Sequence, residues 1–365
     1  MRIAVLSKRQ YMRKDVLDDR YGRLHDLPWH LAARGHAVLG LCLSYRPRNQ
    51  GLIRRELDGA LTWHSFNLTR PDRYLRHTLA LLRDFQPDLL LGCSDSPHII
   101  LTAALANWLD LPYVADLYDN FESFGLTRLP GIRTLYRRAV SRAAAVSCVS
   151  ATLAAHIQTT CQPIGPVIAL ESTINAGQFQ PLNRAACRQQ LGLPLNARLI
   201  GTAGALDHNR GIDTLYQAFN SLAERDSNLH LVLAGSASAD SPIPAHPRIL
   251  YLGELPHDHM PTLFNALDIA IICIRDTAFG RYSFPQKAYE MLACGVPLIA
   301  AAVGSVGDLL REDRYSLYRP DDAQDLAEKI IGQLTQFRAP NLVIPTWVDQ
   351  AEKLERLLQR IILAE

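Results

Sequence analysis

Short apolar runs alternate with helix-like segments along almost the whole chain, and this alternation limits the possible folds more than any other feature. Strand-like runs occur at residues 2–7, 37–43, 88–93, 113–116 and 145–150, and again at 198–203, 229–234, 249–252, 268–274 and 297–301. Helical periodicity falls between them, at residues 27–34, 74–85, 97–109 and 134–144, and later at 213–223, 260–266, 284–293 and 321–334. The order predicts parallel sheets covered by helices on both faces.

The alternation is interrupted once, by a stretch rich in polar residues, proline and glycine at residues 162–194. We therefore expect an N-terminal domain at residues 1–168, a C-terminal domain at 169–345, and an amphipathic helix at 346–365 that packs at the domain junction. The predicted fold class is α/β, with two Rossmann-like doubly wound domains facing a cleft. Ligands of such sheets bind at the carboxyl ends of the strands, so the loops after the strands should carry the chemistry.

Composition and charge exclude several classes of protein. Hydrophobic residues make up 48% of the chain and charged residues 20%, which suits a large core. The net charge is only +2, but residues 1–150 hold 21 Lys and Arg against 14 Asp and Glu. A basic first half favours an anionic ligand or surface, whereas the whole chain is unlike a dedicated nucleic-acid binder.

Cysteine usage and apolar stretches indicate a cytoplasmic protein. The seven cysteines are scattered without a Cys-x-x-Cys pair, which is typical of reduced thiols and gives no spacing for a metal site. The first residues are charged too early for a signal peptide, and the long uncharged stretches contain polar residues, proline or glycine. Any membrane contact should therefore be peripheral, at the inner face of the plasma membrane. No Gly-x-Gly-x-x-Gly or Walker loop indicates a dinucleotide or ATP cofactor.

Residues 279–297 carry the most informative pattern, a loop followed by a helix and a strand. Ser283 and Gln286 form a capping-box pattern at the expected helix start, where free backbone N–H groups suit a diphosphate. Lys287 and Glu290 are three residues apart and share a helix face, so the cation could bind phosphate while the carboxylate binds ribose hydroxyls. The alternative is an ion pair on a solvated face.

A second pattern lies at residues 201–213, where a strand ends in a glycine loop before a helix. Gly204 stands in the loop and Arg210 just before the helix, which is a usual place for a phosphate clamp. The alternative is a turning loop with a surface arginine.

Together these segments resemble the nucleotide-sugar half of glycosyltransferase family 4, retaining enzymes of GT-B architecture. The resemblance rests on the order of the glycine loop, Leu233-Ala234-Gly235, Leu252-Gly253 and a Pro-x-Lys-x-x-Glu helix that runs into Cys294-Gly295-Val296-Pro297. It implies that Arg210 and Lys287 clamp the diphosphate and that Glu290 binds ribose. This sequence departs from many members, since Tyr282 stands where they have a first glutamate and Ala205 where they often have arginine.

In the first half, three acids follow the apolar residues Tyr113–Ala115 of a strand, within Asp116-Leu117-Tyr118-Asp119-Asn120-Phe121-Glu122. The segment resembles the Asp-x-x-Asp loop that occupies the catalytic histidine position in some family members. We expect Asp119 to be the main catalytic residue, near the reacting sugar carbon, and Asp116 the second. The alternative is that Asp116 braces the loop.

Two basic clusters accompany these acids. The loop after the first strand holds Lys8, Arg9 and Arg13, which could bind an anionic acceptor such as a lipid-linked diphosphate, or could simply be solvated. A predicted helix carries Arg133, Arg137, Arg138 and Arg142 beside Leu135 and Tyr136, and could contact anionic lipid headgroups, although such a row is more often a soluble face.

The resemblance therefore implies a retaining glycosyltransferase that uses a UDP- or GDP-sugar, and we expect no cofactor and no metal. The resemblance implies a saccharide or lipid-linked saccharide acceptor in surface polysaccharide synthesis. Two alternatives stay open: a nucleotide-sugar epimerase of the same fold, and a non-catalytic nucleotide-sugar-binding subunit.

Overall fold

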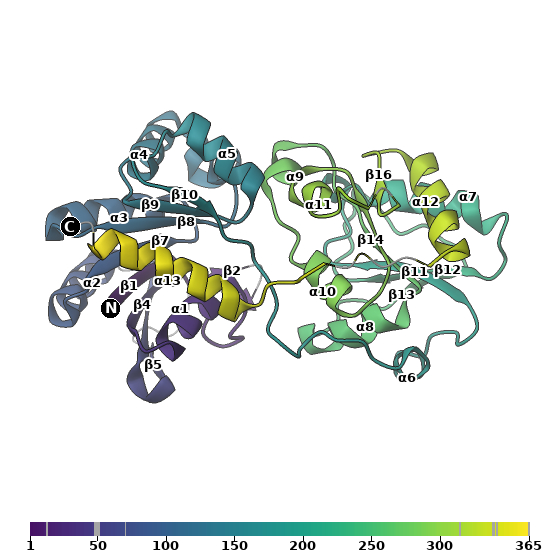
Figure 1. Cartoon of the computed structure of the whole chain (residues 1–365), viewed down its shortest axis with the longest axis horizontal. Coiled ribbons are helices and arrows are strands. Elements are labelled where there is room, and N and C mark those ends of the chain that lie inside the picture. Colours follow the sequence, from purple (N-terminus) through teal and green to yellow (C-terminus); the bar gives the residue numbers. More distant parts are fainter. Residues whose placement is uncertain are drawn as a thin grey trace. The chain divides into compact units, whose positions relative to one another are not determined.

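The computed structural model describes residues 1–11, 14–46, 52–69, 71–313, 315–337, 340 and 342–363. The chain divides into two compact units, and Figure 1 colours the chain from its N-terminus in purple to its C-terminus in yellow. Unit 1 holds Met1–Thr173 and Pro345–Glu365, and unit 2 holds Ile174–Ile344. The boundary expected near residue 168 falls inside a strand, Val167–Ala169, and the chain leaves unit 1 only after Thr173.

The described part of unit 1 contains an eight-stranded sheet in the order β10-β9-β8-β7-β1-β4-β6-β5. Its strands are β1 (Arg2–Lys8), β4 (Ala37–Ser44), β5 (Leu52–Glu56), β6 (Leu61–Asn67), β7 (Leu89–Cys93), β8 (Tyr113–Leu117), β9 (Ala145–Cys148) and β10 (Val167–Ala169). Neighbouring strands run parallel except for the antiparallel edge pair β5–β6. After β1 the chain adds β4, β5 and β6 on one side of this strand, and it then adds β7, β8, β9 and β10 on the other side. The switch point, where the direction of strand addition reverses, therefore lies at the carboxyl ends of β1 and β7.

The helices of unit 1 are α1 (Arg23–Ala33), α2 (Pro71–Phe85), α3 (Ser96–Leu109), α4 (Pro130–Ser141), α5 (Ala151–Thr160) and α13 (Trp347–Leu363). The last helix, expected at the domain junction, packs along α1 within unit 1 (Figure 1). Trp347 and Leu358 of α13 share a core with Leu24 and Leu31 of α1. Burial of this apolar face explains why a helix from the end of the chain is part of the N-terminal unit.

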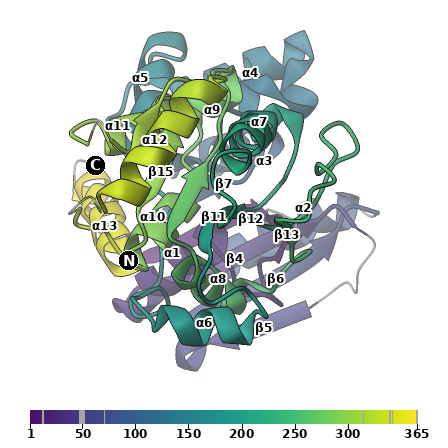
Figure 2. The same ribbon diagram turned by 90° about the vertical axis from the view of Figure 1, so that its right-hand side faces the viewer.

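Unit 2 has a parallel sheet in the order β13-β12-β11-β14-β15-β16. Its strands are β11 (Arg198–Ala203), β12 (Leu229–Ala234), β13 (Ile249–Tyr251), β14 (Ile269–Ile272), β15 (Leu298–Ala301) and β16 (Leu317–Tyr318). Its helices are α6 (Arg184–Gln190), α7 (Ile212–Ala223), α8 (Met260–Ala266), α9 (Ala278–Tyr282), α10 (Lys287–Ala293), α11 (Gly304–Leu309) and α12 (Ala323–Thr335). Figure 2 shows α7 and α12 on one side of the sheet and α6 and α8 on the other.

The predicted α/β class with two Rossmann-like units is confirmed. In unit 2 the chain runs outward from β11 through β12 to β13, and from β14 through β15 to β16, so the switch point lies between β11 and β14. None of the described helices combines the length and the apolar character needed to cross a bilayer.

Candidate active site

The backbone is tightly packed at the carboxyl end of β11, beside the switch point of unit 2. Gly204 is exposed and adopts a φ of +120°, a region that favours glycine. A Cβ on Gly235, in the loop after β12, would lie 1.9 Å from the Gly204 carbonyl oxygen. The two glycines therefore allow neighbouring loops to touch and leave open backbone at the edge of the sheet where ligands bind.

Lys287 brings a cation to this place. It is the first residue of α10, is partly buried, and its Nζ donates to the Ala203 carbonyl oxygen at 2.9 Å, at the end of β11. A Cβ on Gly204 would lie 3.7 Å from that Nζ. Burial, and next the positive charge of Arg210, lower the pKa of Lys287 to about 8.

Arg210 is held by local structure in the loop after β11. It ends a short 3-10 turn, His208–Arg210, and its backbone N–H donates to the capping carboxylate of Asp207 at 2.9 Å. Its guanidinium lies 4.5 Å from the ring centroid of Phe279, a cation–π contact that fixes the side chain. The structure thus brings Gly204, Arg210 and Lys287 together, and adds Phe279, which the sequence analysis did not select.

Glu290 is buried in α10, one turn after Lys287. Its Oε1 lies 3.3 Å from His257 Nε2 and 3.3 Å from Gln286 Nε2, which orients the carboxylate from two sides. Among the described residues no ion pair joins Glu290 to Lys287, so the alternative of a solvated ion pair does not describe this helix. His257, from the loop after β13, was missed because nothing near it in the sequence marks it.

The predicted capping box at Ser283 is wrong. Ser283 ends α9 as its C-cap, and its carbonyl oxygen accepts from Ser305 Oγ at 3.0 Å. Helix α10 begins four residues later, at Lys287, and the Gln286 side chain turns toward Glu290 instead of back to Ser283. The backbone N–H groups of Ala288, Tyr289 and Glu290 donate to the carbonyl oxygens of Pro285 and Gln286, so these groups at the start of α10 are already used within the chain.

In unit 1, Asp116 lies in a buried network. Its carboxylate accepts from Arg23 Nε at 2.8 Å and Nη2 at 2.5 Å, and from Ser147 Oγ at 2.5 Å. Arg23 also donates to the Leu170 carbonyl oxygen, and both members of the pair are almost completely inaccessible to solvent. These contacts join α1, β8, β9 and the segment after β10, so Asp116 has the bracing role that was the alternative interpretation.

Asp119 lies two residues beyond the end of β8 and is partly buried. One of its oxygens accepts from the Asn120 backbone N–H at 2.7 Å. Lys8, at the end of β1, donates to Tyr118 Oη at 2.7 Å. Burial lowers the pKa of Lys8, while the negative charges of Asp95 and Asp119 oppose that shift. Lys8 and Asp119 therefore interact electrostatically at the carboxyl edge of this sheet.

The other two basic residues of the loop differ from Lys8. Arg9 is buried and is paired with Asp15 and Asp18, each at 2.9 Å, and it donates to Ser65 Oγ at 3.1 Å. These contacts account for its charge without an acceptor. Arg13 lies outside the described residues.

A buried dyad beside Lys8 was not selected from the sequence as a site. Asp95 caps α3 and accepts from the His98 backbone N–H, and its Oδ1 lies 2.6 Å from His98 Nδ1. Tyr45 Oη donates to the other carboxylate oxygen at 2.8 Å. Although burial acts to raise the pKa of Asp95, its contacts with His98 and Tyr45 hold that pKa below its usual value. The Asp-x-x-His spacing at a helix start was the available signal.

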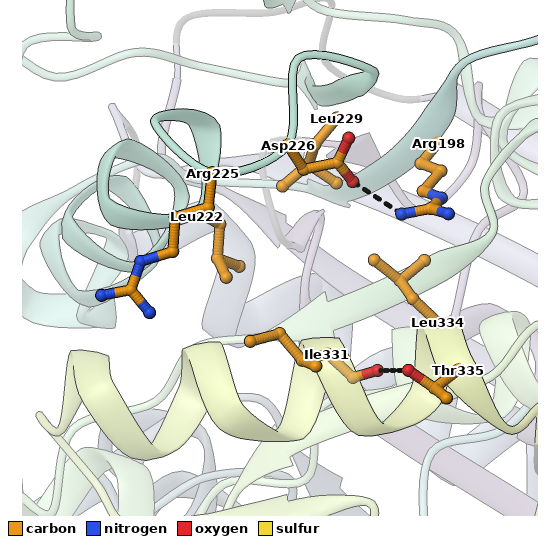
Figure 3. Close-up of a pocket in the computed structure, with 8 residues that line it drawn as sticks. All are labelled: Arg198, Leu222, Arg225, Asp226, Leu229, Ile331, Leu334 and Thr335. Carbon is orange, nitrogen blue, oxygen red and sulfur yellow. Dashed lines mark hydrogen bonds and ion pairs between the residues drawn. The ribbon is translucent and has the colours of Figure 1, made fainter.

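A pocket in unit 2 (Figure 3) lies at the amino ends of the strands, whereas Gly204 and Lys287 lie at the carboxyl end of β11. Arg198 and Leu229, the first residues of β11 and β12, line it together with the ends of α7 and α12. Arg198 and Asp226 form an ion pair across it at 2.8 Å. Because parallel sheets bind ligands at their carboxyl ends, this pocket is not part of the candidate site.

Comparison with known proteins gives matches in both units. Residues 23–167 match the family model Glycosyltransferase Family 4, and residues 197–336 match Glycosyl transferases group 1. The Bacillus subtilis protein TuaC, whose name places it among glycosyltransferases of teichuronic acid biosynthesis, is 26% identical over 291 residues, covering 78% of this chain and 69% of the relative. A D-inositol 3-phosphate glycosyltransferase of Corynebacterium aurimucosum is 31% identical over 157 residues, but covers only 39% of this chain and 36% of its own.

Solved structures share the fold over the full chain. Sucrose-phosphate synthase from Thermosynechococcus elongatus superposes with a TM-score of 0.70 at 17% identity, covering 99% of this chain and 96% of the other. HepE from Anabaena, in complex with UDP, gives a TM-score of 0.67 at 18% identity, covering 100% and 97%. At these identities the likeness establishes the architecture.

Proposed function

The chain is a glycosyltransferase of GT-B fold, with a family 4 domain followed by a group 1 domain, and from that premise we propose its donor, acceptor class and stereochemistry. The donor is a UDP- or GDP-sugar bound by unit 2. The acceptor is a saccharide or lipid-linked saccharide bound by unit 1, and the sugar is transferred with retention at the anomeric carbon. The product belongs to surface polysaccharide synthesis, as the name of TuaC indicates for that relative.

The observation that carries the donor assignment is the pairing of Arg210 with Lys287 beside Gly204. Two cations within electrostatic reach of each other repel, and the lowered pKa of Lys287 reflects that repulsion after burial. A diphosphate between them would remove the repulsion and form charge-assisted hydrogen bonds. UDP bound to the HepE relative supports this class of ligand.

Glu290 supplies the second part of the donor assignment. A buried carboxylate oriented by His257 and Gln286 is suited to accept hydrogen bonds from two adjacent ribose hydroxyls. Arg210 and Lys287 would then neutralise the diphosphate as it leaves. In this proposal cationic side chains supply the positive charge, and no metal is assigned.

The catalytic role is assigned to Asp119 in unit 1. Its carboxylate would orient the acceptor hydroxyl or stabilise the positive charge that develops at the anomeric carbon. Lys8 is its positioning residue, because its ammonium group interacts electrostatically with the Asp119 carboxylate. Asp116 is not proposed as catalytic, since its contacts with Arg23 and Ser147 occupy it.

Nucleotide identification comes first in the test. A thermal-shift screen against UDP, GDP, ADP and their sugars should show stabilisation by one base series. The Asp119→Asn variant should keep that stabilisation and lose transfer by about 100-fold or more, as expected when a group that acts in the transition state is removed.

Product analysis separates the alternatives. NMR of the product should show the anomeric configuration of the donor. An inverted product would overturn retention, and epimerisation of the donor without acceptor would indicate an epimerase. Binding of a nucleotide sugar with no product across an acceptor panel would indicate a binding subunit.

A further inference from the structure

A surface of unit 1 combines exposed apolar side chains with arginines. It is formed by the 3-10 turn Gly125–Arg128, the helix α4 that follows it, and the loop after α5. The large apolar residues Leu126, Leu129, Leu135 and Ile164 are exposed by 58%, 55%, 50% and 80%. Ile164 adjoins the end of α4, because its backbone N–H donates to the Ser141 carbonyl oxygen at 2.9 Å. We call this set of residues, with the arginines described next, the α4 surface.

The arginines of the α4 surface are Arg128, Arg133, Arg138 and Arg142, all exposed. Arg128 donates to the Ser123 carbonyl oxygen, and among the described residues no acid forms an ion pair with any of the four. Arg137 differs, since Glu122 neutralises it at 2.6 Å. The chain from residue 123 to 170 contains no Asp or Glu, so this positive charge is not offset locally.

The packing of α4 explains why these side chains stay outside. Tyr136, Ala139 and Val140 form the buried face of the helix, and α4 packs on α3 through such contacts. Tyr136 is completely buried, and that burial strongly raises the pKa of its hydroxyl, so this tyrosine belongs to the core and not to the α4 surface. Leu135, Arg138 and Arg142 are exposed on the outer side of the helix. Helix α4 is therefore amphipathic, with one side in the core and the other in solvent.

We propose that the α4 surface docks the protein on an anionic membrane. Leucine side chains would enter the boundary between headgroups and acyl chains, while the arginines around them bind lipid phosphates. An acidic protein or a nucleic acid could bind the arginines, but neither partner would explain why four large apolar side chains are exposed beside them. A lipid interface accounts for both features of the surface, which occur together along the turn Gly125–Arg128 and helix α4.

The test uses the full chain and sedimentation with vesicles of phosphatidylcholine, with and without phosphatidylglycerol. The wild type should sediment only with the anionic vesicles. Arg133→Gln/Arg138→Gln/Arg142→Gln should lower the affinity about 100-fold, since each arginine contributes a factor of about five. The matched control, Arg73→Gln/Arg225→Gln/Arg360→Gln, has the same net charge at three exposed positions elsewhere and should retain most of the binding.

The contribution of the apolar side chains to membrane binding is tested by the variant Leu126→Ser/Leu129→Ser/Leu135→Ser. Its affinity should fall at least about tenfold, and its residual binding should be more sensitive to salt than that of the wild type. Equal loss in the control arginine variant, or sedimentation of the wild type with neither kind of vesicle, would overturn the proposal. A dimer that the leucine substitutions dissociate, without vesicle binding, would instead identify a self-association surface.

These measurements contain no sugar nucleotide and no acceptor. Their result is therefore independent of the proposed reaction, and circular dichroism of each variant verifies that the fold is kept.

Discussion

At the scale of single residues, Lys287 is a cation that loses its charge close to physiological pH. With a pKa of about 8 in the free protein, it should bind the nucleotide diphosphate fully charged below that pH. The bound anion raises its pKa, so binding above about pH 8 requires uptake of a proton. We expect the affinity for UDP or GDP to be nearly constant between about pH 7 and about pH 8, where the terminal phosphate is ionised, and to fall up to tenfold per pH unit above that range.

Isothermal titration calorimetry between about pH 7 and about pH 9.5 measures this dependence, and Lys287→Arg is the control because arginine stays charged throughout. The variant should show a flat profile. A wild-type affinity that stays constant over the range would contradict the proposal that Lys287 takes up a proton when the diphosphate binds.

Asp116 and Asp119 should separate stability from activity. Asp116→Asn leaves the buried Arg23 without its counter-charge, and we expect unfolding to become easier by about 3–5 kcal/mol. Asp119→Asn should change stability by less than about 1 kcal/mol, because the side chain is only partly buried. Urea unfolding followed by circular dichroism gives both values, and similar losses in the two variants would refute the assignment.

The sequence could not distinguish these two acids, because both lie close to the end of the same predicted strand. What decides between them is Arg23, which lies 93 residues away from Asp116 in the sequence and meets it only in the folded sheet. The ion pairs of Arg9 are local, since its partners Asp15 and Asp18 follow within the next nine residues of the sequence. His257 had no signal of this kind, because its partner Glu290 lies in another element.

At the scale of elements, the packing of α13 on α1 gives a direct stability prediction. Trp347 is 1% exposed and lies in the core of unit 1, so Trp347→Ala should destabilise this unit by about 3–5 kcal/mol. Its neighbour in α13, Val348, is 47% exposed, and Val348→Ala should cost less than about 1 kcal/mol. Thermal unfolding compares the two, and equal shifts would mean that α13 does not stabilise unit 1.

Elements with a continuous apolar run or a clear helical period were predictable, and elements that lack them were not. β1, β7 and β12 are buried on both faces and appear as apolar runs. β6 alternates buried and half-buried residues, and because polar residues interrupt it, a search for continuous apolar runs does not find it. The start of α10 was misplaced because Ser283-x-x-Gln286 fits a capping box, while the short helix α9, which occupies residues 278–282, has no strong period of its own.

At the scale of the whole molecule, the repeated strand–helix order and the two motif segments of the second half were enough to predict the fold class and the enzyme class. The order of motifs is local in sequence and survives substitution, so the resemblance to family 4 was visible without coordinates. The donor site needed the sheet topology, because Gly204 and Lys287 are 83 residues apart in the sequence and meet, with Arg210, beside the switch point of unit 2.

The most direct test of the account is calorimetric titration of UDP and GDP into the wild type, Arg210→Ala/Lys287→Ala, and Arg281→Ala. Arg281 is an exposed arginine of the adjacent helix α9, paired with Asp276 at 2.5 Å, and serves as the matched control. Loss of two charge-assisted contacts should weaken nucleotide binding at least about 100-fold in the double variant, with a change of less than about threefold in the control. Wild-type affinity in the double variant would contradict the claim that these two cations bind the diphosphate.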